Sequence, residues 1–173
     1  MICPTDTVYG FLADATNKKA VSKIFSIKKR PKSKPLSLFV KDIAMAKELA
    51  LINEKQTSVL KKFWPGKHTY IFKRILYDVG RRSPQKIYGV GKDTVAVRIP
   101  NHEFLNKLLK KIDVPLAQTS VNISGKHPLD KIDDIIKQFG KANILIINGG
   151  DIRNGKASKV IDATKDTINI LRP

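Results

Sequence analysis

The sequence contains a single cysteine, Cys3, among its 173 residues. One thiol cannot form a disulfide within the chain, and it argues against a metal site built from thiolates. No stretch approaches the run of about 20 apolar residues that crosses a bilayer. The first residues, "MICPTDTVYG", also lack the charged and then apolar pattern of a signal peptide. We therefore expect a cytoplasmic protein of one domain that does not insert into membranes.

Acidic residues are scarce as well, because 15 Asp and Glu stand against 33 Lys and Arg, a formal net charge of +18. Such an excess favours polyanionic partners such as nucleic acids or nucleotides. However, only seven of the basic residues are Arg, and the 26 Lys are spread through nearly every part of the chain. A general compositional bias towards Lys explains the charge equally well, so charge alone does not identify a nucleic-acid binder.

Two familiar kinds of site are missing. His68, His102 and His127 lie in separate predicted elements without the spacing of metal ligands, so we expect structural or surface roles for them. The segment 150–157, "GDIRNGKA", matches the Gly and Lys positions of a phosphate-binding P-loop. It has Ala157 where a P-loop needs Ser or Thr, and a strand rather than a helix is predicted after it. We therefore reject a P-loop.

What is present is an alternation of helical and strand patterns. Apolar spacing and capping residues predict helices at 17–29, 42–50, 53–64, 101–112 and 130–140. The predicted caps are Asn17, Asp42, Asn53 and Asn101, with Gly140 ending the last helix. Strands are predicted at 36–40, 68–74, 94–100, 115–119, 143–148 and 159–163, and a loop or hairpin at 75–93. The pattern predicts one α/β domain with a mixed sheet.

Polar residues gather at the ends of several predicted elements. In "KKRPKSKP" (28–35), two prolines hold the chain extended, so Lys28 and Arg30 are expected on a stiff loop suited to phosphate oxygens. In "TVAVRIP" (94–100), strand alternation places Thr94, Ala96 and Arg98 on one face. The stretch "QTSVNISGK" (118–126) offers hydrogen-bond donors and acceptors but no activated nucleophile. These segments predict a binding site for a polar ligand at one edge of the sheet.

Taken in order, "PTDTVYG", "IKKRPKSKPL", "FWPGKHTYIF", "DTVAVRIPNH", "PLAQTSVNISG", "INGG", "ASKVID" and "LRP" resemble the motifs of the YrdC/Sua5 family of TsaC-type threonylcarbamoyl-AMP synthases. The resemblance covers nearly the whole chain. It implies a single YrdC-like domain over 1–173, an α/β fold with a twisted mixed sheet flanked by helices, and a concave basic face. The helix that precedes "PT-acidic-T" in many members and the additional Sua5 domain are not expected within 1–173.

The resemblance also implies a reaction. The family joins L-threonine, bicarbonate or CO2, and ATP to give L-threonylcarbamoyladenylate and pyrophosphate, for the t6A modification of tRNA. Mg2+ is expected as a cofactor held by the ATP phosphates, with no metal ligands from protein side chains. The partners implied are ATP, L-threonine, bicarbonate and the downstream t6A transferase machinery, with a possible contact to tRNA or double-stranded RNA.

Residue roles follow from the same resemblance. Thr7, Arg98 and Ser158 are expected to bind threonine, with Arg98 pairing with its carboxylate. ATP is expected at Lys28, Arg30, Lys34, Thr94, Gln118 (through its backbone), Ser120, Asn122 and Arg172. Of these, Lys28, Arg30, Ser120 and Asn122 are expected to be catalytic. The chain differs from the common family pattern at Lys34, Phe39 and Ala157.

Two alternatives stay open at this point. The charge could belong to an RNA-binding module without catalysis, whose affinity would fall steeply with added salt. A related domain of hydrogenase maturation proteins makes a carbamoyl-adenylate from carbamoyl phosphate, but it belongs to much longer chains. The synthase is our first hypothesis because it accounts for most of the polar motifs.

Overall fold

The computed structural model describes residues 1–76, 86–165 and 169–173. Within them, the strands form one mixed sheet in the order β1-β2-β6-β3-β5-β4-β7-β8. The strands are β1 Ile2–Cys3, β2 Gly10–Asp14, β3 Ser37–Phe39, β4 His68–Lys73, β5 Thr94–Arg98, β6 Leu116–Ser120, β7 Lys159–Asp162 and β8 Asn169–Arg172. The pairs β3–β5 and β4–β7 are parallel, whereas the other neighbours are antiparallel. The mixed sheet predicted from the sequence is confirmed.

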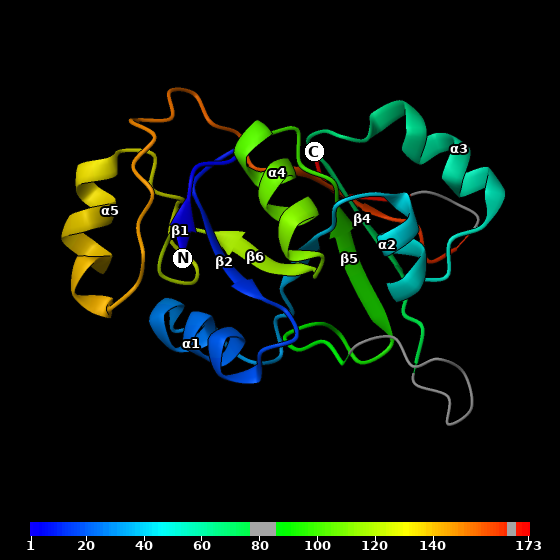
Figure 1. Ribbon diagram of the computed structural model, residues 1–173, viewed down its shortest axis with the longest axis horizontal. Helices are drawn as coiled ribbons and strands as arrows, with labels where there is room; N and C mark the ends of the chain where they lie inside the picture. Colours follow the sequence, from blue (N-terminus) through cyan, green and yellow to red (C-terminus); the bar gives the residue numbers. More distant parts are fainter. Residues whose placement is uncertain (77–85, 166–168) are drawn as a thin grey trace.

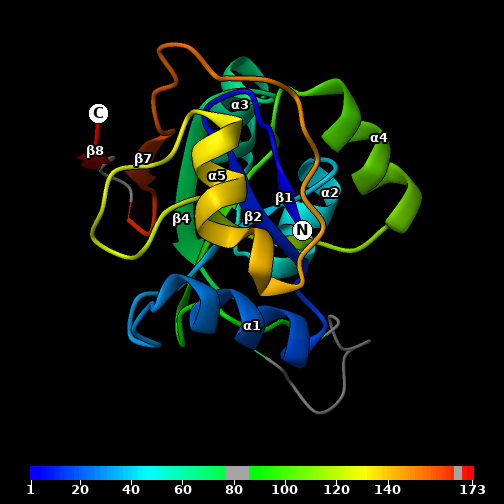
Figure 2. The same ribbon diagram turned by 90° about the vertical axis from the view of Figure 1, so that its left-hand side faces the viewer.

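Helices surround the sheet, as Figures 1 and 2 show. They are α1 Lys18–Lys28, α2 Ile43–Leu49, α3 Glu54–Phe63, α4 Glu103–Ile112 and α5 Ile132–Phe139, followed by a short 3-10 turn, Gly140–Ala142. The first three begin at the caps predicted from the sequence, because the side chains of Asn17, Asp42 and Asn53 each accept a hydrogen bond from a backbone N–H of the first turn.

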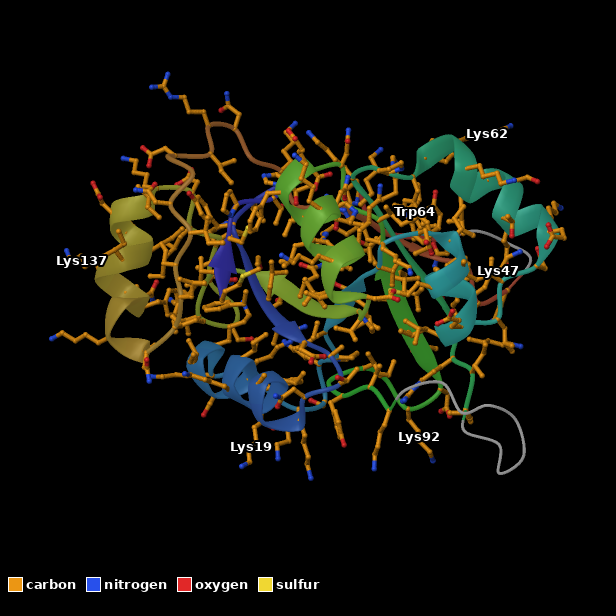
Figure 3. All side chains as sticks on the ribbon, in the orientation of Figure 1. Lys19, Lys47, Lys62, Trp64, Lys92 and Lys137 are labelled. Carbon is orange, nitrogen blue, oxygen red and sulfur yellow. The ribbon has the colours of Figure 1, made fainter. Side chains whose placement is uncertain are left out.

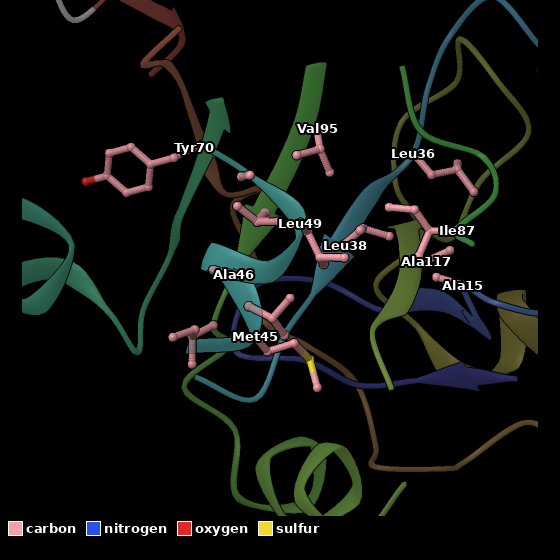
Figure 4. Close-up of a cluster of buried hydrophobic side chains, with 14 of the residues drawn as sticks. Ala15, Leu36, Leu38, Met45, Ala46, Leu49, Tyr70, Ile87, Val95 and Ala117 are labelled. Carbon is pink, nitrogen blue, oxygen red and sulfur yellow. The ribbon is translucent and has the colours of Figure 1, made fainter. Parts of the chain in front are cut away.

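The two faces of the sheet bury different side chains because neighbouring residues in a strand point in opposite directions. The larger cluster packs one face against α2 and other helices, with Leu38 and Val95 against Met45 and Leu49, as Figure 4 shows. The smaller cluster packs the opposite face against α4; its buried members are Cys3, Leu12, Phe39, Leu105, Leu109 and Leu116. The rest of this second face is where the polar residues described below lie.

Four details differ from the sequence predictions. The segment 143–148 is not a strand, because the described residues give it a single bridge, between Ile146 and Ile2 of the two-residue strand β1. Strand β8, at the chain end, was not predicted. Helix α4 begins after His102 rather than Asn101, whose backbone N–H donates to Asp6 instead. Gly140 is the residue at which α5 ends, as predicted, but it is right-handed rather than left-handed and leads into the 3-10 turn.

The predicted loop or hairpin at 75–93 is described only at its ends, since residues 77–85 lie outside the described part. Residues 86–93 contain no strand. Figure 3 shows Lys19, Lys47, Lys62, Lys92 and Lys137 on separate elements around the periphery of the view, as expected for lysines spread along the chain. Among the described residues, no helix has both the length and the apolar character needed to cross a membrane.

Candidate active site

A hollow of about 330 Å³ opens on the sheet face that α4 leaves uncovered. Strands β3 to β8 and the loop between β1 and β2 all contribute to its lining. The predicted face of β5 is confirmed because Thr94, Ala96 and Arg98 all line it. The hollow brings together most of the site residues predicted from the sequence: Thr7, Arg30, Thr94, Arg98, Gln118, Ser120, Ser158 and Arg172. The predicted residues Lys28, Lys34 and Asn122 are not among its lining.

Arg98 is a buried guanidinium at one end of the hollow, with 1% of its surface exposed. Its Nε donates to the Gly66 carbonyl at 2.8 Å, its Nη1 donates to Thr7 Oγ1 at 3.2 Å, and its Nη2 donates to Asp6 Oδ1. The guanidinium carbon lies 5.4 Å from the centre of the Phe39 ring. Burial lowers the pKa of Arg98, and the adjacent Asp6 carboxylate opposes that shift.

A guanidinium has five N–H donors, and three of those on Arg98 are engaged by the described residues. One N–H on each Nη remains for a ligand in the hollow. Guanidinium N–H donors suit a carboxylate. The prediction that Arg98 pairs with an amino-acid carboxylate is therefore compatible with its geometry.

Asp6 was not singled out from the sequence. Its second oxygen, Oδ2, accepts from the backbone N–H of Asn101 at 3.1 Å, so its two oxygens hold the last residue of β5 and the segment that follows the strand. Its side chain is 7% exposed and that of Arg98 is 2% exposed, which makes the contact a buried ion pair. The sequence showed an acid between two threonines, but only the fold shows that this acid reaches β5.

Thr7 has a defined hydrogen-bond direction. Thr5 Oγ1 donates to the Val8 carbonyl at 2.7 Å, so its only proton is used, and its 2.9 Å contact with Thr7 Oγ1 must be donated by Thr7. Thr7 Oγ1 also accepts from Arg98. The remaining lone pair of Thr7 can therefore only accept a hydrogen bond, as from the ammonium group of an amino acid.

Ser158 lies beside a second hydroxyl, that of Thr69. The distance between Ser158 Oγ and Thr69 Oγ1 is 2.9 Å, and both residues are buried. Arg172 holds Ser158 from the chain end, with Nε donating to its carbonyl at 2.8 Å and Nη2 to its Oγ at 3.2 Å. Thr69 also lines the hollow, although the sequence gave no reason to select it.

Arg30 organises the loop at the other end of the hollow. Its Nε donates to the Lys34 carbonyl and its Nη2 to the Pro35 carbonyl, both at 2.9 Å, so the guanidinium closes the 30–35 loop on itself. Burial lowers the pKa of Arg30. Arg30 reaches the hollow, whereas Lys34 is exposed and its described hydrogen bonds are those of its backbone carbonyl to Arg30 and its backbone N–H to Pro31. The stiff loop predicted from the prolines thus presents Arg30 but not Lys28.

Lys28 is not on that loop. It is the last residue of α1, is 1% exposed, and donates to the carbonyls of Ser120 and Asn122 at 2.6 and 3.0 Å and to Asn122 Oδ1 at 2.7 Å. All three protons of its ammonium group are therefore directed at protein acceptors. Burial, with a smaller effect from the Arg30 cation, lowers the pKa of Lys28 to about 8. The expectation that Lys28 is presented by an extended loop is wrong, because its α1 position buries it.

The "QTSVNISG" stretch forms a fixed turn over Lys28. Ser120 Oγ donates to Asn122 Oδ1 at 2.8 Å, while Asn122 Nδ2 donates to the carbonyls of Ile123 and Lys126 at 3.0 and 2.5 Å. Asn122 is 7% exposed, and both ends of its amide are engaged. Of this pair, Ser120 is the one that lines the hollow, with Gln118, whose amide donates to Ser37 Oγ at 2.5 Å.

The sequence matches a family model for Sua5, YciO and YrdC proteins, described as "Telomere recombination", over residues 1–173. A putative threonylcarbamoyl-AMP synthase of Methanocaldococcus jannaschii is 36% identical over 172 residues, 99% of this chain and 78% of that protein. The threonylcarbamoyl-AMP synthase of Bacillus subtilis is 34% identical over 171 residues, 98% of this chain and 48% of that protein. A crystal structure of Pyrococcus abyssi Sua5 with L-threonine matches with a TM-score of 0.85 at 38% identity, covering 98% of this chain and 48% of that one. The chain thus spans about half the length of the last two proteins.

Proposed function

The chain belongs to the Sua5/YciO/YrdC family, and from this membership we propose that it is an L-threonylcarbamoyladenylate synthase. The proposed enzyme is a nucleotidyltransferase that converts L-threonine, bicarbonate or CO2, and ATP into threonylcarbamoyl-AMP and pyrophosphate. Relatives that carry the name threonylcarbamoyl-AMP synthase, and the related structure that holds L-threonine, support this proposal.

The observation that carries the proposal is the set of groups around Arg98. Two of its N–H donors are available for a carboxylate, and Thr7 Oγ1, at 3.2 Å from Nη1, can only accept a further hydrogen bond. A carboxylate that lies beside an ammonium group is the signature of a free amino acid. The predicted threonine-binding set Thr7, Arg98 and Ser158 lines this one hollow, which supports its assignment to threonine.

The nucleotide would occupy the other end, between the 30–35 loop and the Ser120 turn. Arg30, Ser120, Thr94 and Gln118 line this part of the hollow, and Arg172 lies beside Ser158. Arg30 offers a guanidinium for phosphate oxygens. Lys28 and Asn122 would act without lining the hollow. Their hydrogen bonds hold the Ser120 turn in place, and the positive charge of Lys28 lies close to that turn.

The chemistry needs orientation more than a protein nucleophile. Threonine amine and bicarbonate condense to a carbamate with loss of water, and a carbamate oxygen then attacks the α-phosphorus of ATP, displacing pyrophosphate. Arg98 would fix the amino acid, and Arg30 would offset negative charge on the phosphates. The described lining residues include no Asp or Glu, which fits Mg2+ carried by the ATP phosphates rather than by protein ligands. When bound there, Mg2+ neutralises phosphate charge.

The product is a mixed anhydride of a carbamic acid and a phosphate. Such a compound has to be consumed by a transferase that moves the threonylcarbamoyl group to an amine and releases AMP. We propose that this step belongs to the t6A machinery acting on tRNA, and any direct contact of the chain with tRNA is part of the same proposal.

The test is pyrophosphate release from ATP and Mg2+, with threonine and bicarbonate supplied together or singly. We expect release only when both are present. Arg98→Ala should abolish the threonine-dependent release, and Arg30→Ala should raise the KM for ATP. Lys137→Ala, which removes an exposed charge on α5, is the control and should behave as the wild type.

Release that does not depend on threonine, or that survives Arg98→Ala unchanged, would contradict the proposal. A folded protein that binds neither ATP nor threonine but binds RNA with a steep salt dependence would support the RNA-binding alternative instead.

A further inference from the structure

Thr69 and Ser158 meet because two distant strands pair. Strands β4 and β7 are parallel, with Thr69 opposite Val160, and Ser158 comes directly before β7. The two hydroxyl oxygens lie 2.9 Å apart, with Thr69 2% and Ser158 5% exposed. Both residues line the hollow, so this hydroxyl pair is part of the wall that faces the ligand.

The protons of the pair can be counted. Two hydroxyls carry two protons, and one of them forms the bond between the oxygens. Arg172 Nη2 also donates to Ser158 Oγ at 3.2 Å, so that oxygen already accepts from a cation. The described residues offer neither hydroxyl any further hydrogen bond. One hydroxyl proton of the pair is therefore left for a ligand in the hollow.

We infer that Thr69 is a positioning residue for substrate binding: it donates to Ser158 Oγ and so directs the Ser158 proton at an anionic oxygen of the amino-acid substrate. The positive charge of Arg172 polarises the Ser158 hydroxyl, which strengthens the hydrogen bond that Ser158 donates to the substrate. Without the Thr69 hydroxyl, this hydrogen bond no longer fixes the orientation of the Ser158 hydroxyl, and its proton is no longer held towards the substrate. This inference rests on the proposed function, because it assumes that Ser158 binds threonine.

The key variant is Thr69→Val, which keeps the branched shape and removes only the hydroxyl. Thr57→Val is the matched control: Thr57 is also buried, and its hydroxyl donates to the Asn53 carbonyl at 2.8 Å on α3, outside the hollow. Thr69→Ser restores a hydroxyl at the same position. Calorimetry would measure the dissociation constants of L-threonine and of a non-hydrolysable ATP analogue for each protein.

We expect Thr69→Val to weaken threonine binding about tenfold, the effect of losing one hydrogen bond to a charged group. Binding of the ATP analogue should change less than about twofold, and Thr69→Ser should recover most of the threonine affinity. Thr57→Val should bind both ligands as the wild type does. A merely structural role for Thr69 would instead lower the melting temperature and weaken both ligands together.

A double variant tests whether Thr69 acts through Ser158. Thr69→Val added to Ser158→Ala should weaken threonine binding no further than Ser158→Ala alone. Unchanged threonine affinity in Thr69→Val, or full additivity in the double variant, would overturn the inference while leaving the proposed function standing. If the wild type binds ATP but not threonine, the proposed function fails first and the inference fails with it.

Discussion

Raising the pH should stabilise this protein by removing a charge from its interior. The group responsible is Lys28, which is 1% exposed and has three hydrogen-bond acceptors around its ammonium group but no carboxylate among its described partners. Burial lowers its pKa from 10.5 to about 8. Below pH 8, the lysine is charged in both the folded and the unfolded chain. Between pH 8 and 10.5, the unfolded chain holds a proton that the folded chain has released, so the free energy of unfolding rises with pH.

The size of the effect follows from the two pKa values. At roughly 1.4 kcal/mol for each pH unit that separates them, the full gain is at most roughly 3 kcal/mol. Integrating the linkage from pH 7 to 9.5 gives a gain of about 2 kcal/mol from this one group. Many other groups titrate in the same range, so the gain has to be measured as a difference between two proteins.

The comparison is with Lys28→Met, which has similar length and no charge. Urea unfolding at intervals from pH 7 to 9.5 gives the free energy of unfolding of each protein. The wild type should gain about 2 kcal/mol relative to Lys28→Met over this range. Lys137→Met, which removes an exposed lysine on α5, is the control for losing one positive charge. A difference between wild type and Lys28→Met that stays flat with pH would refute the reasoning.

Two further predictions concern the threonine end of the hollow. Asp6→Ala leaves the buried Arg98 without its carboxylate and should lower the free energy of unfolding by about 3–5 kcal/mol in thermal or urea denaturation. Asp113→Asn is the control, because it breaks an exposed ion pair and should change the free energy of unfolding little. Equal effects of the two variants would contradict the prediction. At Gly155, a Cβ would lie 2.6 Å from a backbone carbonyl of the β1–β2 loop. Gly155→Ala should therefore lower stability by about 1–3 kcal/mol and raise the KM for threonine. Gly140→Ala is the control, because Gly140 is right-handed and has room for a methyl group, so this variant should be neutral or slightly stabilising. If Gly155→Ala unfolded with the same free energy as Gly140→Ala, the predicted clash at Gly155 would be contradicted.

Local signals in the sequence predicted the elements well. The caps Asn17, Asp42 and Asn53 act on the turn that follows them, so residues three positions apart are enough to locate each helix start. The face shared by Thr94 and Arg98 needs only the alternation of a single strand. These features depend on near neighbours in the chain, which a sequence shows directly.

The missed features depend on distant neighbours. Asp6 and Arg98 are 92 positions apart, and Thr69 and Ser158 are 89 apart, so only the pairing of strands brings them together. Lys28 stands in a run of basic residues that is typical of an exposed segment, yet its acceptors on Ser120 and Asn122 belong to another strand end. Nothing near these residues in the sequence reports such contacts.

The strand order has a consequence for how the chain acquires this hollow. Strand β6 lies between β2 and β3, although it is made long after both. Until it arrives, the two earlier strands have no shared partner, and the turn that Lys28 holds does not yet exist. Ser158 and Arg172 are made later still. They belong to the part of the sheet beyond β4, where β7 pairs with β4 and β8 pairs with β7. On a ribosome, the helices can form early because their contacts are local, whereas the ligand-binding wall is complete only after Ser158 and Arg172 have emerged. A nascent chain stalled before β6 should therefore already be helical but unable to retain either substrate.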